Sequence, residues 1–358
     1  MLATIASVWS SVWPILVAIA IFLFFILIHE FGHFLAAKLM GVRVNEFAIG
    51  FGPKMFSFGK GETKYSVRWI PLGGYCAMEG EDDDSEDDKA FGKKPVWRRI
   101  IIVVAGALFN ILLGFLIVVI MTAFTPVIGT TTVEQFNEGA VSPSYGLKEG
   151  DKIVSVNGKS VFVTDDITYY AASSTDGNVK MQVKRDGEVI DLDIQFGAEN
   201  NYPNLDFKVA RAEKNIGTVI SYSFWDSISM MRMIYSSIGG MLTGQYGLDD
   251  MAGPVGMVQQ VSQAAKYGLD TFLWIAALIT INLGIFNLLP IPGLDGGRLL
   301  FLIIEGIARR PVPKKYEAYI HLAGIALLLL LSVCLLYTSY KNLFTLTLLY
   351  IYCKIILI

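Results

Sequence analysis

The chain has 358 residues, of which 53% belong to the apolar set AVILMFWYC and only 17% are charged. Soluble domains average about 25% charged residues, so this composition argues against a purely soluble protein. The same apolar content, with 12% aromatic residues, excludes intrinsic disorder. With 29 lysines and arginines against 32 aspartates and glutamates, the chain has no basic field to neutralise phosphates, and we expect no nucleic-acid partner.

Four apolar stretches have about the 20 residues that are needed to cross the hydrocarbon core of a bilayer. They extend approximately from Trp13 to Leu39, from Ile100 to Phe124, from Thr271 to Leu289 and from Tyr319 to Tyr337. The first has no basic segment before it and no small-residue cleavage site, so we predict an uncleaved anchor rather than a signal peptide. The sequence therefore predicts a polytopic α-helical membrane protein with about four transmembrane helices.

The distribution of basic residues predicts the orientation of these spans. None precedes the first span, whereas the segment from Lys38 to Arg99 and the loop from Arg298 to Lys315 are rich in lysine and arginine. By the positive-inside rule, both segments are cytoplasmic. We therefore expect a multi-pass protein of the cytoplasmic membrane, with the N-terminus and the long segment between the second and third spans outside the cytoplasm.

The first cytoplasmic segment contains two predicted strands. Apolar and polar residues alternate over Lys64–Ile70, which is typical of a half-buried strand, and the aromatic stretch Phe47–Phe58 is interpreted as a second strand. Together they would form a β-hairpin region on the cytoplasmic side of the membrane, closed by Gly73 and Gly74. The acidic run Glu79–Asp88 is expected to be a solvated, mobile loop.

The extracytoplasmic segment begins with a predicted small domain of short strands, Thr130–Phe196. Within it, Val179–Val183 and Val189–Ile194 flank the turn signal Asp186-Gly187, which indicates a hairpin. From Ser221 to Gly268 the apolar spacing becomes helical. We expect an amphipathic helix there, either on the membrane surface or packed on the spans.

The pentad His29-Glu30-Phe31-Gly32-His33 lies at the inner end of the first span. Residues four apart lie on one face of a helix, so both imidazoles can reach one metal ion with Glu30 beside them. Zinc hydrolysis needs this pattern, in which two imidazoles hold the ion and a carboxylate takes a proton from water. The alternative, two histidines that only reach toward the interface, is less favourable because titratable groups inside a span are costly and usually functional.

A catalytic zinc site needs a third protein ligand. The candidates near membrane depth are Asp295, Glu305, Glu46 and His321. Asp295 is favoured because Pro290 and Pro292 interrupt an apolar helix just before it, and irregular backbone at this depth is tolerated only where it lines a cavity or is buried in protein. His321, at the start of the fourth span, is expected to be an interfacial residue.

With HEFGH in the first span and NLLPIPGLDGG at residues 287–297, the chain resembles the site-2 protease family of intramembrane zinc metalloproteases, in particular its bacterial sigma-factor-regulating branch. Further matching signatures are GFGP at 50–53, PLGGY at 71–75, KPVWRR at 94–99 and AGPVG at 252–256. The resemblance extends from about Ile15 to Leu336. One departure is Ala107, where the family usually has proline.

The resemblance implies one zinc ion per chain, held by His29, His33 and Asp295, with Glu30 activating water. It also implies that substrate binding involves Asn287, which could stabilise the oxyanion, and the glycines Gly50, Gly52, Gly73 and Gly74. The implied reaction is hydrolysis of a peptide bond within the transmembrane segment of a membrane protein, such as an anti-sigma factor, after an upstream site-1-type protease has trimmed it. The active site would lie near the cytoplasmic side of a bacterial cytoplasmic membrane.

The extracytoplasmic domain resembles a single PDZ domain through GLKEGDKI at 146–153 and VNG at 156–158. We therefore expect an inserted PDZ-like α/β domain, which either reads a new C-terminus or excludes untrimmed substrates by size. The expected organisation is a membrane core in two parts (1–126 and 269–340), a PDZ-like domain (127–200), a helical linker (201–268) and an uncertain tail (341–358).

A helix must unwind before it can be cleaved, and its freed backbone groups need partners in the membrane. We expect the strands around Phe47–Phe58 and Lys64–Ile70 to add the substrate as a further strand, unless they only dock on the membrane.

Two other functions would also place polar groups in spans: a zinc transporter, and a catalytically silent scaffold. The clustering of these groups at one depth argues against the first, and the presence of Glu30 with a complete ligand set argues against the second.

Overall fold

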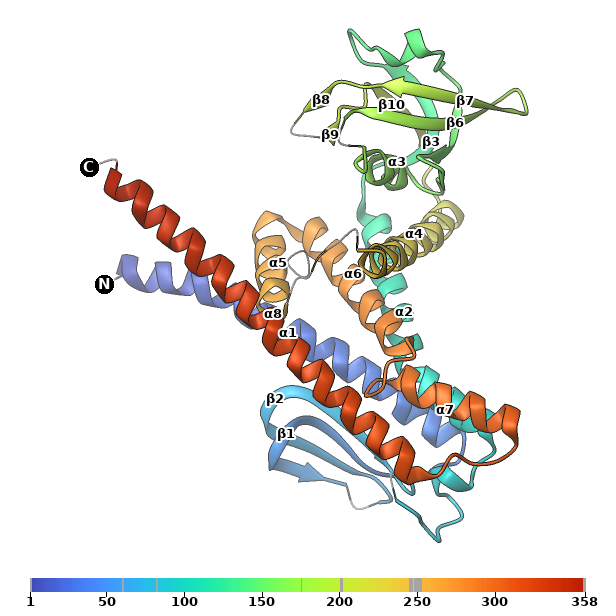
Figure 1. The fold of residues 1–358 in the computed structure, drawn as a ribbon, viewed down its shortest axis with the longest axis vertical. Helices are drawn as coiled ribbons and strands as arrows, with labels where there is room; N and C mark the ends of the chain where they lie inside the picture. Colours follow the sequence, from blue (N-terminus) through green and yellow to red (C-terminus); the bar gives the residue numbers. More distant parts are fainter. Residues whose placement is uncertain are drawn as a thin grey trace. The chain divides into compact units, whose positions relative to one another are not determined.

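The computed structural model describes residues 2–59, 61–81, 83–174, 176–199, 202–244, 247 and 253–356 (Figure 1). The chain divides into two compact units. The first combines residues 1–114 with 235–358, and the second comprises residues 115–234.

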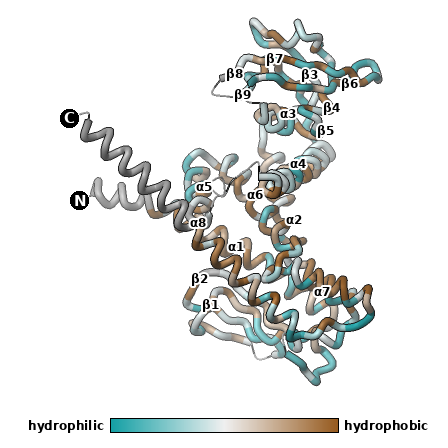
Figure 2. The backbone as a smooth tube through the Cα atoms, in the orientation of Figure 1, coloured by the Kyte–Doolittle hydropathy of each residue, from teal (hydrophilic) through white to brown (hydrophobic). Residues whose placement is uncertain are grey.

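The helices α1 (Leu2–Leu39), α2 (Val96–Phe124), α6 (Leu269–Leu288) and α8 (Lys314–Ile356) contain the candidate membrane spans. Their apolar segments are Val12–Leu39, Val96–Phe124, Leu269–Leu288 and Lys314–Leu335. Figure 2 shows hydrophobic residues along the coloured part of α1 and along the first half of α8. The predicted polytopic helical membrane protein is thus confirmed. The tail predicted at 341–358 continues α8 as far as Ile356, and its side chains lie outside the described part of the chain.

Small residues bring α2 close to its helical neighbours in the first unit. A Cβ atom on Gly32 of α1 would lie 2.5 Å from the carbonyl oxygen of Ala105, and one on Gly284 of α6 would lie 2.8 Å from that of Ala107. Both positions therefore exclude any larger residue unless the helices move apart. Such contacts are the usual basis of close helix packing in membranes.

The β region consists of two long strands, β1 (Val44–Phe58) and β2 (Lys64–Met78), which pair antiparallel and curl on themselves. Residues 46–49 of β1 pair with residues 74–77 on one side and with residues 64–67 on the other. The strand predicted at Lys64–Ile70 therefore does not end at Gly73 and Gly74, as expected, but continues through them. Gly73 has φ +83°, a left-handed conformation that glycine adopts without strain, so the chain bends there while strand pairing continues.

This curled arrangement changes which strand edges are free. Residues 65–67 pair with β1 residues 47–49 on one side and 56–58 on the other, so they lie inside the sheet. Within the β1–β2 sheet, the segments 54–58 and 74–78 are the long stretches with a strand neighbour on one side only. The expectation that Lys64–Ile70 offers an edge to a substrate is therefore wrong over 65–67.

The acidic run Glu79–Asp88, expected to be mobile, is tied to the rest of the first unit. Arg43 Nη1 lies 2.5 Å from Asp87 Oδ2, Lys314 Nζ lies 3.1 Å from Asp84 Oδ1, and Arg298 pairs with Glu81. Asp82 lies outside the described residues. The prediction missed these contacts because two of the three basic partners lie more than 200 residues away in the sequence.

A tight turn joins α6 to α7 (Asp295–Ala308) in the first unit. A Cβ atom on Gly296 would lie 2.0 Å from the carbonyl oxygen of Leu289, so only glycine fits against the turn. The backbone N–H of Gly293 donates to His321 Nδ1 on α8 at 3.0 Å. His321, predicted as an interfacial residue, thus fastens this turn to α8.

The second unit contains an antiparallel sheet in the order β10-β3-β4-β6-β7, with β5 paired to β4. The strands are β3 (Ile128–Phe136), β4 (Lys152–Val156), β5 (Lys159–Ser160), β6 (Asn178–Arg185), β7 (Glu188–Gln195) and β10 (Phe207–Ala212). The predicted hairpin is confirmed as β6–β7, with Asp186 and Gly187 at φ +49° and +93°. Because β10 pairs with β3, the domain extends beyond the boundary expected at residue 200.

Several short elements complete the two units. The helix α3 (Thr164–Ala171) contributes Ile167 and Tyr170 to a core that also contains Ile153 and Val183. The remaining short elements of the second unit are η2 (Ser142–Tyr145), β8 (Ala198–Glu199) and β9 (Tyr202–Pro203). The first unit contains η1 (Phe91–Lys93) just before α2.

The segment predicted as one amphipathic helix forms two, α4 (Ile216–Leu242) and α5 (Pro254–Tyr267). Within the second unit, Ser229 Oγ of α4 donates to Asp166 Oδ2 of α3 at 2.9 Å. The guanidinium of Arg232 lies over the Phe162 ring at 4.5 Å from its centroid. This part of α4 is therefore packed against the sheet domain. The sequence pattern had indicated only the membrane surface or the spans as its partners.

Candidate metal centre

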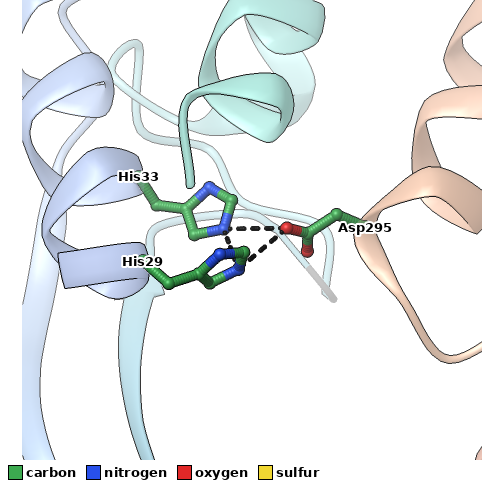
Figure 3. Close-up of side chains that lie close together, drawn as sticks. All are labelled: His29, His33 and Asp295. Atoms are coloured by element: carbon green, nitrogen blue, oxygen red, sulfur yellow. Dashed lines mark hydrogen bonds and ion pairs between the residues drawn. The ribbon is translucent and has the colours of Figure 1, made fainter. Parts of the chain in front are cut away.

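Three side chains from two helices of the first unit converge on one point (Figure 3). His29 and His33 are buried and one turn apart on α1, and Asp295 is the first residue of α7. Asp295 Oδ2 lies 3.0 Å from His29 Nε2 and 3.1 Å from His33 Nε2. The two Nε2 atoms are 3.2 Å apart, so the three atoms form a nearly equilateral triangle.

This triangle fits a tetrahedral zinc ion. With bonds of about 2.0–2.1 Å, two ligands of such an ion are roughly 3.3 Å apart, and a His₂-carboxylate set is a known catalytic donor set. Three ligand atoms would leave the fourth position for water or substrate. Of the titratable residues in the described part of the chain, this is the one group of three that could hold a metal ion.

The protonation of His33 also favours a metal ion at this point. Its Nδ1 lies 2.8 Å from the backbone carbonyl oxygen of Ile102, which can only accept a hydrogen bond, so Nδ1 carries the proton. The Nε2 atom of a neutral His33 then directs a lone pair at Asp295 Oδ2, which is also an acceptor. A proton on His33 Nε2 would satisfy this one contact, whereas a single metal ion would satisfy both histidines and the carboxylate at once.

A glycine of α2 leaves room for the His33 ring. A Cβ atom on Gly106 would lie 2.3 Å from His33 Nε2 and 2.7 Å from its Cε1. Real carbon atoms do not approach so closely, so any side chain at Gly106 would displace the imidazole. The close α1–α2 approach and the position of the ring therefore depend on the same residue.

Glu30 lies next to His29 on α1 and beside the β region. A Cβ atom on Gly74 of β2 would be 3.5 Å from Glu30 Cγ, so the edge segment 74–78 passes the glutamate that follows the first histidine. A carboxylate at this place can exchange a proton with water near the metal. Gly74 is the one member of the four-glycine set that the described contacts place beside the pentad.

For the other predicted substrate residues, the described contacts include none with the three ligand side chains. Gly50 and Gly52 have φ +84°, and a Cβ atom on Gly73 would meet the Phe51 ring at 2.3 Å, so these glycines are explained by the curl of the sheet. Asn287 is half-buried in the last turn of α6. Its role stays a prediction.

The remaining ligand candidates pair elsewhere. Glu305 accepts two hydrogen bonds from the Arg99 guanidinium. Burial acts to raise the pKa of Glu46, but hydrogen bonds from Ser66 and Arg68 outweigh it and hold the pKa at about 2. Both carboxylates are therefore engaged by cations or hydroxyl groups of the protein, and Asp295 is the carboxylate that reaches the histidines.

The residues that sequence reasoning missed are the ones that hold the ligands. The Ile102 carbonyl could not be found, because a backbone contact has no residue signature. Asn110 is fully buried on α2, and its Nδ2 lies 3.3 Å from His29 Nδ1. A polar amide inside an apolar span is a signal that could have identified it.

Four membrane spans, two histidines and a carboxylate in one triangle, and a glutamate beside them define a membrane-embedded metal-dependent hydrolase. The model of peptidase family M50 matches residues 17–331. The chain therefore belongs to peptidase family M50, the site-2 protease family, and it is a zinc metalloprotease.

Curated relatives agree with this family over most of the chain. A protein named putative zinc metalloprotease from Clostridium perfringens (strain 13 / Type A) is 34% identical over 322 residues, covering 89% of this chain and 96% of the relative. A protein with the same description from Clostridium acetobutylicum is 33% identical over 328 residues, with 90% and 96% covered. The regulator of sigma-W protease RasP of Bacillus subtilis (strain 168) is 30% identical over 412 residues, with 91% and 98% covered.

Proposed function

We propose that this protein cleaves a peptide bond within the transmembrane segment of a membrane-protein substrate, with His29, His33 and Asp295 as the zinc ligands. The observation that carries the proposal is the triangle of ligand atoms at 3.0–3.2 Å. The position of the pentad within the candidate span Val12–Leu39 supports a reaction at membrane depth.

Different residues of the chain have different roles in the proposed reaction. Zinc, when bound, supplies Lewis-acid activation of water and of the scissile carbonyl. Glu30 receives the proton of the attacking water and passes it to the leaving amine. Asn287 supplies an amide for the substrate or the developing oxyanion. The buried histidines exclude bulk water, which strengthens these interactions.

The substrate reaches the site as an added strand. An unwound segment needs partners for its backbone groups, and the edge segment 74–78 of β2 has a strand neighbour on one side only while it passes Glu30. A substrate paired with this edge would present its backbone to the metal centre. Gly74, without a side chain, leaves the close approach open.

The name of the Bacillus relative supports the choice of substrate. That protein regulates sigma-W, and we infer that this chain acts on a comparable regulator, an anti-sigma factor, that an upstream site-1-type protease has already trimmed. The basic residues of 38–99 and 298–315 support an orientation with the N-terminus outside and the active site near the cytoplasmic side.

We assign a PDZ-like role to the sheet domain, which would then be extracytoplasmic. The glycine-rich loop at 146–150 and the edge strand β10 are the supporting features, because PDZ domains bind a peptide along a sheet edge. The domain either reads the C-terminus made by the first cut or excludes untrimmed substrates. Removal of the whole sheet, 128–212, separates these roles: cleavage of uncut substrate supports exclusion, and lost cleavage of trimmed substrate supports reading.

The proposed function is tested by cleavage of a reporter with one transmembrane segment and a short outside stub in membranes. The wild type and Glu30→Gln are compared with zinc content measured for both. We expect Glu30→Gln to keep zinc and to lose at least about 100-fold in cleavage. Equal cleavage by both proteins would overturn the mechanism, and zinc uptake into vesicles would favour the transporter alternative instead.

A further inference from the structure

We propose that Asn110 is a positioning residue that fixes His29 as a metal ligand by accepting a hydrogen bond from His29 Nδ1. This inference rests on the proposed metal centre and adds a residue whose role the family match does not define. In the structure, Asn110 Nδ2 faces His29 Nδ1, although metal binding would require an acceptor at that place.

The amide of Asn110 is placed against His29 with its acceptor unused. The residue is fully buried, and its Nδ2 lies 3.3 Å from His29 Nδ1. Its Oδ1 is also buried and has no hydrogen-bond partner among the described residues. A buried acceptor without a partner costs roughly 1–3 kcal/mol, so the observed orientation leaves free energy to be gained.

Metal binding specifies which amide atom should face the imidazole. A neutral imidazole has one N–H group, and His29 must offer the Nε2 lone pair to the metal, so its proton is on Nδ1. The partner of Nδ1 must then accept, which Nδ2 of an amide cannot do. A half-turn about the Cβ–Cγ bond exchanges the two amide atoms and brings Oδ1 to the place that faces Nδ1.

The surroundings hold Asn110 where this contact is possible. Its own backbone carbonyl accepts from Thr280 Oγ1 of α6 at 3.2 Å, and Gly284 of α6 packs on the turn of α2 that precedes it. The backbone of Asn110 therefore cannot move away from α1 without breaking the packing of α2 on α6. The position of Asn110 is thus imposed by helix packing and not by His29.

The two histidines are supported in different ways by the same helix. His33 Nδ1–H donates a hydrogen bond to the backbone carbonyl of Ile102, and a side-chain substitution at Ile102 does not remove that carbonyl. His29 depends on a side chain. The structure therefore offers one residue at which the orientation of a single ligand can be changed while the three ligands are kept.

The test measures zinc retention instead of activity, in the full-length protein with Glu30→Gln so that self-cleavage is absent. Zinc is titrated against a chelator in the parent protein, which keeps Asn110, and in its Asn110→Leu and Asn110→Asp variants. Leucine has a similar size but no acceptor, and aspartate keeps the acceptor. We expect Asn110→Leu to lower zinc affinity about 10–100-fold and Asn110→Asp to restore it to within about threefold of the parent.

A matched control is Asn282→Leu, because Asn282 Oδ1 on α6 is likewise buried without a hydrogen-bond partner among the described residues. This control should keep parental zinc affinity. Unchanged zinc affinity in Asn110→Leu, or equal losses in Asn110→Leu and Asn110→Asp, would overturn the inference while leaving the metal centre intact. If the parent itself binds no more zinc than its His33→Ala variant, the proposed metal centre fails, and that result is distinct.

Discussion

The metal centre and the acidic segment 79–88 are both assembled from residues distant in the sequence, but different forces hold them. The centre depends on buried contacts of fixed geometry, such as His33 Nδ1 to the Ile102 carbonyl and Gly106 against the imidazole. The acidic segment depends on ion pairs in partial contact with water, including Lys314 with the fully exposed Asp84. Buried geometry has no tolerance for added atoms, whereas exposed charge pairs are screened and replaceable.

The largest effect is expected from one methyl group at the metal centre. In Gly106→Ala the new Cβ would lie 2.3 Å from His33 Nε2, so the ring must leave its position. We expect zinc content to fall by more than half and cleavage to fall on the order of 100-fold, measured by metal analysis and the reporter assay. The control is Gly239→Ala, also in a helix but with open space around its Cβ, and normal zinc in Gly106→Ala would contradict the geometry.

The β2 edge gives the next largest effect. The substitution Ala77→Pro removes a backbone N–H group from segment 74–78 near Glu30. We expect cleavage to fall about tenfold or more, with zinc retained. Ser57→Pro makes the same change on the other edge, segment 54–58, and should affect cleavage much less. If the two variants behave alike, the substrate does not add to the edge beside Glu30.

An intermediate effect is expected where the acidic segment meets α7. Arg298 lies three residues after Asp295 on α7, and it pairs with Glu81 and, at 3.8 Å, with Glu317. Arg298→Ala should lower the free energy of unfolding by about 1–3 kcal/mol, since two partly buried carboxylates each lose one charged partner. It should also weaken zinc retention a few-fold through Asp295.

A charge exchange tests whether the pair itself is responsible. Glu81→Arg combined with Arg298→Glu should recover part of the stability that Arg298→Ala loses, measured by thermal unfolding in detergent. If the exchanged protein is no more stable than Arg298→Ala, then Arg298 acts through Glu317 or through packing of its stem, and the acidic segment does not support α7.

The same contrast explains how much the sequence could predict. His29, His33 and Asp295 were identified because fixed spacing on a helix and broken backbone at membrane depth are local signals. The β6–β7 hairpin was likewise local, with alternation around Asp186-Gly187. The docking of Glu81 on Arg298 and the closeness of Asn110 to His29 depend on tertiary packing, which no local pattern specifies.

A smaller and pH-dependent effect is expected at Glu46, whose pKa of about 2 lies below its ordinary value of 4.5. A carboxyl group with a lowered folded-state pKa stabilises the protein above its unfolded-state pKa, and this contribution is lost as the pH falls from about 4.5 toward 2. Glu46→Gln should therefore lower the thermal midpoint at pH 6 and much less at pH 3. A difference that is equal at both pH values would show that the charge of Glu46 is not what stabilises the sheet.

The smallest effect is expected at the exposed end of the acidic segment. Lys314 Nζ contacts the Asp84 carboxylate at 3.1 Å and the Asp83 carbonyl oxygen at 2.7 Å, but Asp84 is fully exposed, so water and salt compete for both groups. Lys314→Ala should change zinc retention and cleavage by less than about twofold, at low and at high salt. A loss comparable to that of Arg298→Ala would mean that the whole segment acts as one unit, and the distinction between buried geometry and exposed charge would not hold at this end of α8.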